Sequence, residues 1–232
     1  MRNGALVGVV IPALNEVEAI GRVIADIPAW VDKIVIADNG STDGTDRAAS
    51  AAGATVVVEP EKGYGAACLA GIAALGTVDI VVFVDGDYSD HPGDMADLVD
   101  PIVSGTVDFT IASRVIGARE AGSLTPQQMF GNWLATRLIA GIWRQKYTDL
   151  GPFRGIRKSS LDKLAMADRN FGWTVEMQIK AAQQKLRVLE VPGRYRRRIG
   201  VSKVSGTLKG TIMAGYKILY VIGRHALRRG SQ

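Results

Sequence analysis

A run of apolar residues that ends abruptly in two carboxylates constrains the fold of this chain more than any other feature. Ile80–Val84 is apolar and mostly β-branched, and Asp85-Gly86-Asp87 follows it directly. Continuous apolar runs of this length are typical of strands buried on both faces, as in a parallel sheet covered by helices. The pattern therefore predicts a central strand that delivers two acidic side chains to one edge of a sheet.

The spacing of these two carboxylates predicts a metal site. Residues i and i+2 of an extended segment point the same way, so Asp85 and Asp87 would lie together, and Gly86 lets a ligand approach the backbone closely. Paired hard oxygen ligands suit Mg2+ or Mn2+, which keep coordination positions for water and substrate phosphates. An isolated acidic turn would explain the same three residues, so the surrounding sequence has to decide.

The surrounding sequence alternates strands and helices. Further strands are expected at Leu6–Ile11, Lys33–Ala37, Thr55–Val58, Phe109–Ser113 and Leu186–Val191. Helices are expected from Asn15 to about Ile27, from Gly63 to about Leu75, and at Pro126–Ile142 and Trp173–Gln184. This alternation predicts an α/β fold with a mostly parallel sheet flanked by helices. Ligands of such sheets bind beyond the carboxyl ends of the strands, so Pro12–Glu16, Asp38–Gly44 and Asp85–Asp87 should converge on one site.

Size and composition limit the classes of function. The chain of 232 residues suits one sizeable domain, and its single cysteine, Cys68, rules out an intrachain disulfide. No signal-peptide pattern precedes the first strand, so a cytoplasmic location is expected. The net charge is +5, and 12 Lys or Arg residues against one acid lie between Lys185 and the C-terminus. Such a tail suits an anionic membrane or a phosphorylated acceptor, and no zinc-finger or RNA-binding pattern points to nucleic acid.

The C-terminal segment is predicted to form a basic amphipathic helix over residues 207–232. Its longest apolar stretch, Thr211–Gly223, is interrupted by Lys217 and falls short of the roughly 20 residues that span a bilayer. An apolar helical stripe stands apart from the basic residues, and consists of Leu208, Ile212, Tyr216, Leu219 and Ile222. The helix could lie on a membrane surface or pack on protein. If it only anchors the protein, its removal should leave the donor site intact.

Seven motifs occur in an order that resembles family 2 glycosyltransferases. They are Pro12–Glu16, Asp38–Thr45, Lys62–Gly65, Asp85–Asp87, Ala112–Arg114, Asp149–Arg154 and Arg198–Lys203. From about Val9 to about Lys203 the chain most resembles the polyprenyl- and dolichyl-phosphate sugar (mannose or glucose) synthases. The resemblance implies a Rossmann-like GT-A-type fold over residues 1–206, with a nucleotide-sugar half (1–115) and an acceptor half (116–206). It also implies inverting transfer of a hexose from a nucleotide-diphosphate sugar to a polyprenyl phosphate.

The same resemblance implies a donor site. Its expected nucleotide-sugar ligands are Pro12, Asn15, Glu16, Asp38, Lys62, Gly63, Asp85 and Gly86. Asn15 could equally cap a helix, and Asp43 could simply stabilise a turn. Two departures from the family pattern matter. Asn39 replaces a second acid, and an extra residue after Asp87 leaves the third metal contact open between Ser89 and Asp90. The nucleotide base and the sugar stay open as well.

Cations within the matched motifs imply an acceptor site. The residues that correspond to phosphate-contacting positions are Arg114, Arg154, Arg198, Ser202 and Lys203. A guanidinium group can bind a phosphate through two parallel hydrogen bonds, which suits this role. The implied catalytic set is Asp85, Asp87, Arg154 and Glu176, with Asp85 and Asp87 holding the metal.

Two alternatives remain open beside a polyprenyl-phosphate enzyme at the cytoplasmic membrane face. An enzyme that glycosylates a soluble or lipid hydroxyl would need a base, and Glu176 stands where related hydroxyl-glycosylating enzymes place one. A lipid phosphate is already ionised near neutral pH, and Glu176 would then orient or support the site. The other alternative is a non-catalytic, membrane-docked protein that binds nucleotide sugars, and the intact Asp85 and Asp87 count against it. The sequence is compatible with a homo-oligomer.

Overall fold

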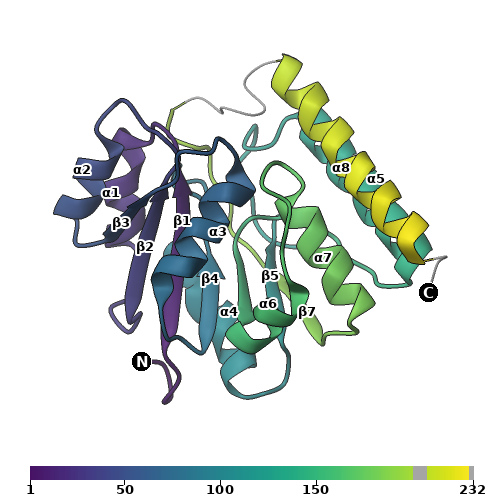
Figure 1. The fold of residues 1–232 in the computed structure, drawn as a ribbon, viewed down its shortest axis with the longest axis horizontal. Helices are drawn as coiled ribbons and strands as arrows, with labels where there is room; N and C mark the ends of the chain where they lie inside the picture. The colour runs from purple at the N-terminus through teal and green to yellow at the C-terminus, as the bar shows by residue number, and fades with distance from the viewer. Residues whose placement is uncertain (201–207, 230–232) are drawn as a thin grey trace.

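A seven-stranded sheet forms the centre of the molecule in the computed structural model, which describes residues 1–200 and 208–229. The strand order is β3-β2-β1-β4-β6-β5-β7 (Figure 1). The strands are β1 (Val7–Ala13), β2 (Lys33–Asp38), β3 (Thr55–Val58), β4 (Ile80–Phe83), β5 (Phe109–Ser113), β6 (Arg154–Arg157) and β7 (Val188–Pro192). The helices are α1 (Val17–Ala25), α2 (Thr45–Ala51), α3 (Tyr64–Leu75), α4 (Met95–Val103), α5 (Pro126–Trp143), α6 (Lys158–Leu164), α7 (Trp173–Gln183) and α8 (Leu208–Arg229), with a 3-10 turn at Pro92–Asp94.

The direction of the strands brings three polar loops to one edge of the sheet. Strand β1 is parallel to β2 and to β4, and β2 is parallel to β3. Ala13 pairs with Asp38, and Val10 pairs with Phe83, so β1, β2 and β4 end close together. The predicted convergence of the three polar segments is therefore confirmed. The sheet is mixed, because β6 runs antiparallel between β4 and β5.

Two hydrophobic clusters cover the two faces of the sheet. Side chains of one strand alternate between them, as in β1, where Val9 and Ile11 face one cluster and Val10 faces the other. Helices α1, α2 and α4 bury apolar side chains in the first cluster. Helices α3, α5, α6, α7 and α8 contribute to the second. The chain thus forms three layers, as the continuous apolar strands predict.

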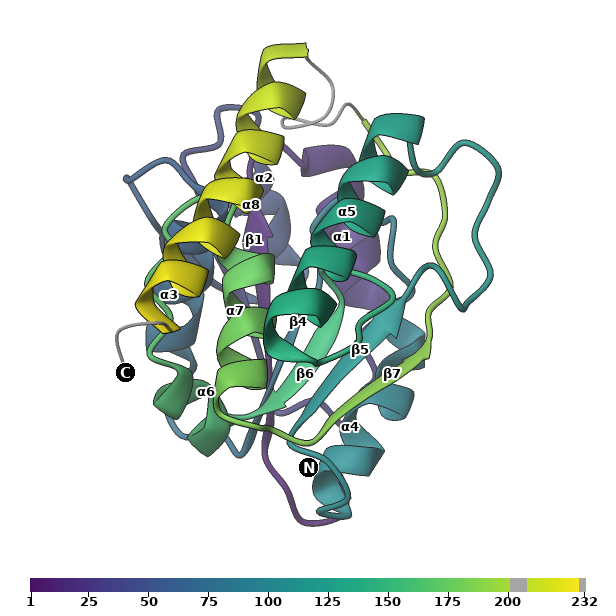
Figure 2. The same ribbon diagram turned by 90° about the vertical axis from the view of Figure 1, so that its right-hand side faces the viewer.

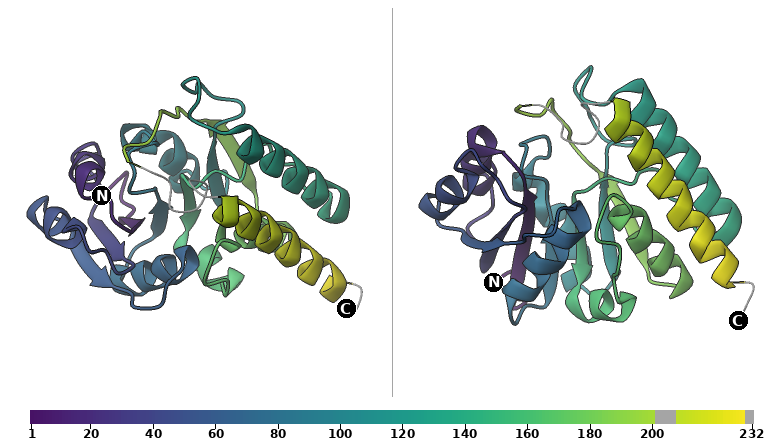
Figure 3. Two further views of the ribbon diagram at one scale, coloured as in Figure 1. Left: turned by 90° about the horizontal axis from the view of Figure 1, so that it is seen from above. Right: turned by 45° about the horizontal axis from the view of Figure 1, so that its top comes forward.

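Helices α5 and α8 lie side by side as an outer layer over α7 (Figures 2 and 3). Val221 and Ile222 of α8 are buried against the second cluster, and Ile218 packs beside them. Other apolar residues of the two helices remain exposed to solvent, including Phe130, Trp133, Met213, Tyr216, Tyr220 and Leu227. Among the described helices, none has the length and apolarity needed to cross a bilayer.

Most predicted elements are confirmed within a few residues, but α4, β6 and α6 were not expected. Strand β6 has the sequence Arg-Gly-Ile-Arg, which lacks the apolar run of a central strand. It is nevertheless central because Arg154 is fully buried and Gly155 fits closely against Thr110, Ile102 and Leu98. A charged residue inside a sheet gives no hydrophobic signal, so this strand was missed.

Candidate active site

A cavity of about 330 Å³ opens where β1, β2 and β4 end. Six of the residues expected to bind a nucleotide sugar line it, namely Pro12, Glu16, Lys62, Gly63, Asp85 and Gly86. Asp87 and Arg198 line it too. We refer to this cavity as the donor pocket. It lies at the sheet edge where the sequence places it, and it combines carboxylates with cations.

Asp85 and Asp87 form the acidic part of the donor pocket. Tyr64 donates a hydrogen bond to Asp85 Oδ1 over 2.9 Å, and Ser89 donates to Asp87 Oδ1 through its main-chain N (2.9 Å) and its hydroxyl (2.5 Å). Burial, and then the negative charge of Asp87, raise the pKa of Asp85 to about 6. A cation bound beside Asp85 and Asp87 would reduce the repulsion between their carboxylates and favour the ionised form of Asp85.

Arg198 closes the other side of this acidic pair. Its guanidinium contacts Asp87 Oδ2 over 3.1 Å and Glu16 Oε1 over 2.9 Å. The main-chain N of Ile199 also donates to the carbonyl of Asp87 over 2.9 Å. The sequence assigned Arg198 to an acceptor phosphate, whereas the structure places it in the donor pocket between the two loops that carry Glu16 and Asp87.

Asn15, Asp38 and Asp43 are predicted residues that hold loops together. Asn15 Oδ1 accepts from the main-chain N of Thr42 over 2.8 Å, and Asp43 accepts from Thr45 and from Val17 N. Asp38 Oδ2 accepts from Gly40 N and Ser41 N, whereas its buried Oδ1 has no partner in the described part of the chain. None of these three side chains lines the donor pocket. Asn15 is not a helix cap, because α1 begins after Glu16.

Asn39 explains one departure from the family pattern. Its Nδ2 donates to the carbonyls of Glu59 and Glu61 over 2.9 and 2.7 Å, and its Oδ1 accepts from Gly63 N over 2.7 Å. An ionised carboxylate could accept from Gly63 but could not donate to two carbonyls. The amide therefore shapes the loop that carries Lys62 into the donor pocket.

The loop Asp168–Gly172 supplies a pocket wall that the sequence did not predict. Asn170 and Phe171 line the donor pocket. The loop packs directly against Gly63 and Gly65, where an added Cβ would come within 2.0 Å of the carbonyls of Arg169 and Asp168. The absence of side chains at these two glycines leaves room for this loop. Nothing in the local sequence of residues 168–172 marks it as a pocket wall, since the contact depends on tertiary packing.

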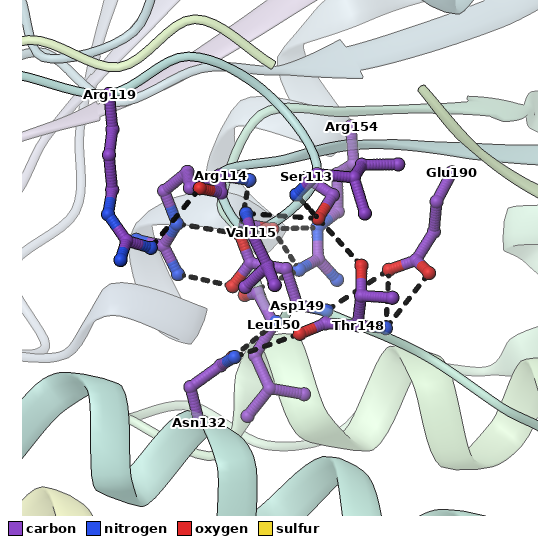
Figure 4. A network of polar contacts seen from close by, with 12 residues as sticks. Ser113, Arg114, Val115, Arg119, Asn132, Thr148, Asp149, Leu150, Arg154 and Glu190 are labelled. Carbon is purple, nitrogen blue, oxygen red and sulfur yellow. Dashed lines mark hydrogen bonds and ion pairs between the residues drawn. The ribbon is translucent and has the colours of Figure 1, made fainter. Parts of the chain in front are cut away.

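The predicted acceptor arginines Arg114 and Arg154 are both tied into the fold (Figure 4). Arg114 follows β5 and forms a two-point ion pair with Asp149, with Nε to Oδ2 and Nη2 to Oδ1 each at 2.7 Å. Arg154 in β6 is fully buried and donates to the carbonyls of Leu150, Gly151 and Thr174. Burial lowers the pKa of Arg154 to about 10. Backbone carbonyls surround its guanidinium and Arg154 does not line the donor pocket, so its contact with a phosphate stays a prediction.

A second cavity of about 600 Å³ lies between α5 and the segment that begins at Arg114. Four cations line it, Arg114, Arg119, Arg137 and Lys146, and none of its described lining residues is acidic. Apolar side chains complete the wall, including Val115, Leu124, Met129 and Trp133. We call it the basic pocket. Arg114 lines only the basic pocket, but its positive charge acts to lower the pKa values of Asp85 and Asp90.

Glu176, in the first turn of α7, is buried and supports the chain rather than facing a cavity. Its carboxylate accepts from Ala167 N (3.1 Å) and Asp168 N (2.7 Å) and pairs with Lys180 (2.9 Å). It lines neither the donor pocket nor the basic pocket. The remaining predicted residues, Ser202 and Lys203, lie outside the described residues.

The donor set fits a divalent cation that is shared with a substrate. Asp85 and Asp87 both line the donor pocket, and burial together with the charge of Asp87 raises the pKa of Asp85, so a cation beside the pair would favour its ionised form. Within the described residues no group of three or more His, Cys, Asp or Glu side chains is arranged to hold a metal. Ser89 and Asp90 are buried and do not line the pocket, and the structure singles out neither as a third ligand. Two carboxylates suit an ion whose other ligands are phosphate oxygens and water.

Comparison with known proteins identifies the class. The chain belongs to glycosyl transferase family 2, whose profile matches residues 8–165. An uncharacterized glycosyltransferase of Mycobacterium tuberculosis is 38% identical over 221 residues, which cover 91% of this chain and 95% of that protein. Undecaprenyl-phosphate mannosyltransferase of Micrococcus luteus is 29% identical over 222 residues, with 87% and 88% coverage.

A solved structure confirms the GT-A-type fold. Glucosyl-3-phosphoglycerate synthase from Mycobacterium tuberculosis, crystallised with Mn2+, UDP and glucosyl-3-phosphoglycerate, matches with a TM-score of 0.76 at 23% identity. The match covers 96% of this chain and 80% of that one. That enzyme binds a nucleotide diphosphate together with Mn2+.

Proposed function

We propose that this family 2 glycosyltransferase transfers a hexose, with inversion, from a nucleotide-diphosphate sugar to a polyprenyl phosphate at the cytoplasmic face of the membrane. The observation that carries the acceptor assignment is the basic pocket, in which four cations and an apolar wall lie beside Arg114. A phosphate attached to an isoprenoid chain offers both of the matching chemistries. The likeness to the undecaprenyl-phosphate mannosyltransferase over most of both chains supports the same substrate class.

The donor pocket would bind the nucleotide sugar between the β1 and β4 loops. Asp85 and Asp87 would hold Mg2+ or Mn2+, which would act as a Lewis acid on the leaving diphosphate. A phosphate oxygen of the acceptor would form a bond to the anomeric carbon as the bond from that carbon to the donor diphosphate breaks. The acceptor oxygen is already ionised, so the step needs no general base. With the metal bound to Asp87, Arg198 would no longer be needed as its ion-pair partner. The guanidinium could then contact the negatively charged diphosphate instead.

The surface of α5 and α8 suits attachment to an anionic membrane. The two helices carry no acidic residue and six basic ones, Arg137, Lys209, Lys217, Arg224, Arg228 and Arg229. They also expose aromatic side chains, Phe130 and Trp133 on α5 and Tyr216 and Tyr220 on α8. Amphipathic aromatic rings and basic side chains favour the interface between lipid headgroups and water. Peripheral attachment at this face would bring the lipid acceptor to the basic pocket.

A soluble acceptor with a reactive hydroxyl is the second candidate, and the likeness to glucosyl-3-phosphoglycerate synthase favours it. The basic pocket would accept a small phosphorylated molecule as well as a lipid phosphate. Against this reading stands Glu176, whose carboxylate is occupied by two main-chain amides and Lys180 and faces neither pocket. A hydroxyl acceptor needs a base at the reacting oxygen.

The decisive experiment offers both acceptors to the full-length protein. UDP- and GDP-linked glucose and mannose are each mixed with Mn2+ and either undecaprenyl phosphate in detergent or 3-phosphoglycerate. We expect a glycolipid that mass spectrometry identifies as the sugar linked to the lipid phosphate. Transfer to 3-phosphoglycerate alone would contradict the lipid assignment. Cleavage of no donor under any of these conditions would favour a non-catalytic binding protein.

Attachment is tested separately. The full-length protein should sediment with vesicles that contain anionic phospholipid at low salt and should be released at high salt, because polybasic attraction is screened. Failure to sediment with these vesicles would contradict the membrane assignment without affecting the donor site.

A further inference from the structure

Helix α8 contacts the wall of the donor pocket through an ion pair. Lys217 Nζ lies 2.9 Å from Asp168 Oδ2, and the carboxylate of Asp168 is almost completely buried. The other oxygen of Asp168 accepts from Asn170 N over 2.8 Å and from Gly172 N over 3.0 Å. One carboxylate therefore joins the C-terminal helix to the backbone of the loop that supplies Asn170 and Phe171 to the pocket.

The loop Asp168–Gly172 packs closely between helix α3 on one side and helix α8 on the other. On the α3 side, the carbonyl of Arg169 accepts from Ala66 N over 2.9 Å. On the α8 side, an added Cβ at Gly172 would come within 2.7 Å of Val221 Cγ2. A shift of α8 would therefore move the loop, because close-packed groups transmit displacement.

The position of this loop matters for a bound nucleotide sugar. Asn170 lines the donor pocket, and its buried Oδ1 has no hydrogen-bond partner within the described part of the chain. Buried polar atoms are normally satisfied, so a hydroxyl or N–H group of the ligand is the natural partner for this oxygen. Because a hydrogen bond needs a donor–acceptor distance of about 3 Å, a small displacement of the loop would break such a bond.

We propose that Lys217 is a positioning residue for nucleotide-sugar binding. Through Asp168 it fixes the Asp168–Gly172 loop where Asn170 and Phe171 form the wall of the donor pocket. Loss of the lysine leaves a buried carboxylate without its ion-pair partner, which is costly, and the loop is expected to rearrange to expose Asp168 to water. The C-terminal helix is then part of the donor site as well as a surface for docking, which revises the expectation that the two are separable. The inference concerns the donor site only and does not depend on the acceptor.

The test compares two substitutions that remove one positive charge each from α8. Lys217→Met removes the partner of Asp168, and Arg228→Met removes an exposed arginine of the same helix for which no ion pair is found within the described residues. Binding of UDP and of GDP, each with Mn2+, is measured by calorimetry on the full-length proteins. Hydrogen exchange at residues 167–172 is measured on the same samples without nucleotide.

We expect Lys217→Met to weaken binding of the preferred nucleotide by about threefold to thirtyfold, as couplings of this kind do, and to speed amide exchange at Asn170 and Gly172. Lys217→Arg should restore both, and Arg228→Met should change neither. In donor turnover the Lys217→Met effect should fall on KM more than on kcat. Unchanged exchange at Asn170 and Gly172 in Lys217→Met would overturn the proposal, whether or not a nucleotide binds. Equal losses in Arg228→Met would also overturn it, because they would assign the effect to the net charge of α8.

Discussion

The donor side and the acceptor side of this molecule use charged residues in opposite ways. On the donor side, Asp85 and Asp87 follow a buried strand and face a cavity, so their position follows from the strand that delivers them. On the acceptor side, Arg114 also directly follows a strand and lines the basic pocket although Asp149 pairs with it, whereas Arg154 lies within β6 and is surrounded by carbonyl groups. A charge that directly follows a strand is therefore a better sign of a pocket than a charge within a strand.

Removing either acid of the donor pocket should give the largest effect and is the strongest test of that comparison. Asp85→Ala and Asp87→Ala should each lower turnover at least about a hundredfold, because stabilisation of the leaving diphosphate is lost. Asp46→Ala, at an exposed position of α2, is the control and should be neutral. Sugar transfer at full rate in excess EDTA would refute the metal-centred role of the pair.

The two arginines can be separated by measuring stability. Arg154→Met should lower the free energy of unfolding by about 2–4 kcal/mol, because it leaves buried carbonyls without donors. Arg198→Met should lower it by less than Arg154→Met does, because Ser89 still donates two hydrogen bonds to Asp87 and the adjoining pocket admits water. Urea denaturation followed by tryptophan fluorescence measures both. Equal stability of the two variants would remove the distinction between a structural and a pocket-lining arginine.

The raised pKa of Asp85 predicts a dependence of stability on pH. The native state binds the proton of this carboxyl more tightly than the unfolded state, so the metal-free protein should lose stability as pH rises from about 4 to about 6 and lose no more from this group above that range. The effect should be about 1–2 kcal/mol, reduced by partial exposure to solvent. Asp85→Asn should abolish this part of the slope. An unchanged slope in that variant would show that Asp85 ionises normally.

Substitution of Glu176 should have the smallest effect on turnover. The size of that effect distinguishes a lipid-phosphate acceptor from a hydroxyl acceptor. Glu176→Gln keeps an oxygen that can accept from Asp168 N, so it should retain at least about a tenth of the activity. A base for a hydroxyl acceptor would instead contribute about 10²–10⁴-fold. A variant that binds donor and acceptor normally but turns over a thousandfold more slowly would overturn the lipid-phosphate assignment.

The parts of the structure that could be predicted are those with local signals. Ile80–Val84 predicts a buried strand from its composition alone, and the order of the strand ends places Pro12, Glu16 and Asp85 at one edge. The parts that were missed depend on long-range contacts. Asn170 reaches the pocket because two glycines of another segment admit its loop, and Arg154 is buried because carbonyl groups compensate its charge. No periodic pattern of apolar residues in the sequence signals either of these contacts.

The antiparallel strand β6 has a consequence for how the chain folds. Residues 154–157 pair with β4 on one side and β5 on the other, so these two strands do not pair directly with each other. Until residue 157 has been synthesised, β4 presents an unpaired edge, and the contacts that close it span more than 70 positions of the chain. Such non-local pairing slows folding, and the partly folded intermediates are prone to aggregation because their strand edges are unpaired. Nascent chains that end before β6 should therefore depend on chaperones, and fragments cut between β5 and β6 should aggregate instead of folding as half-domains.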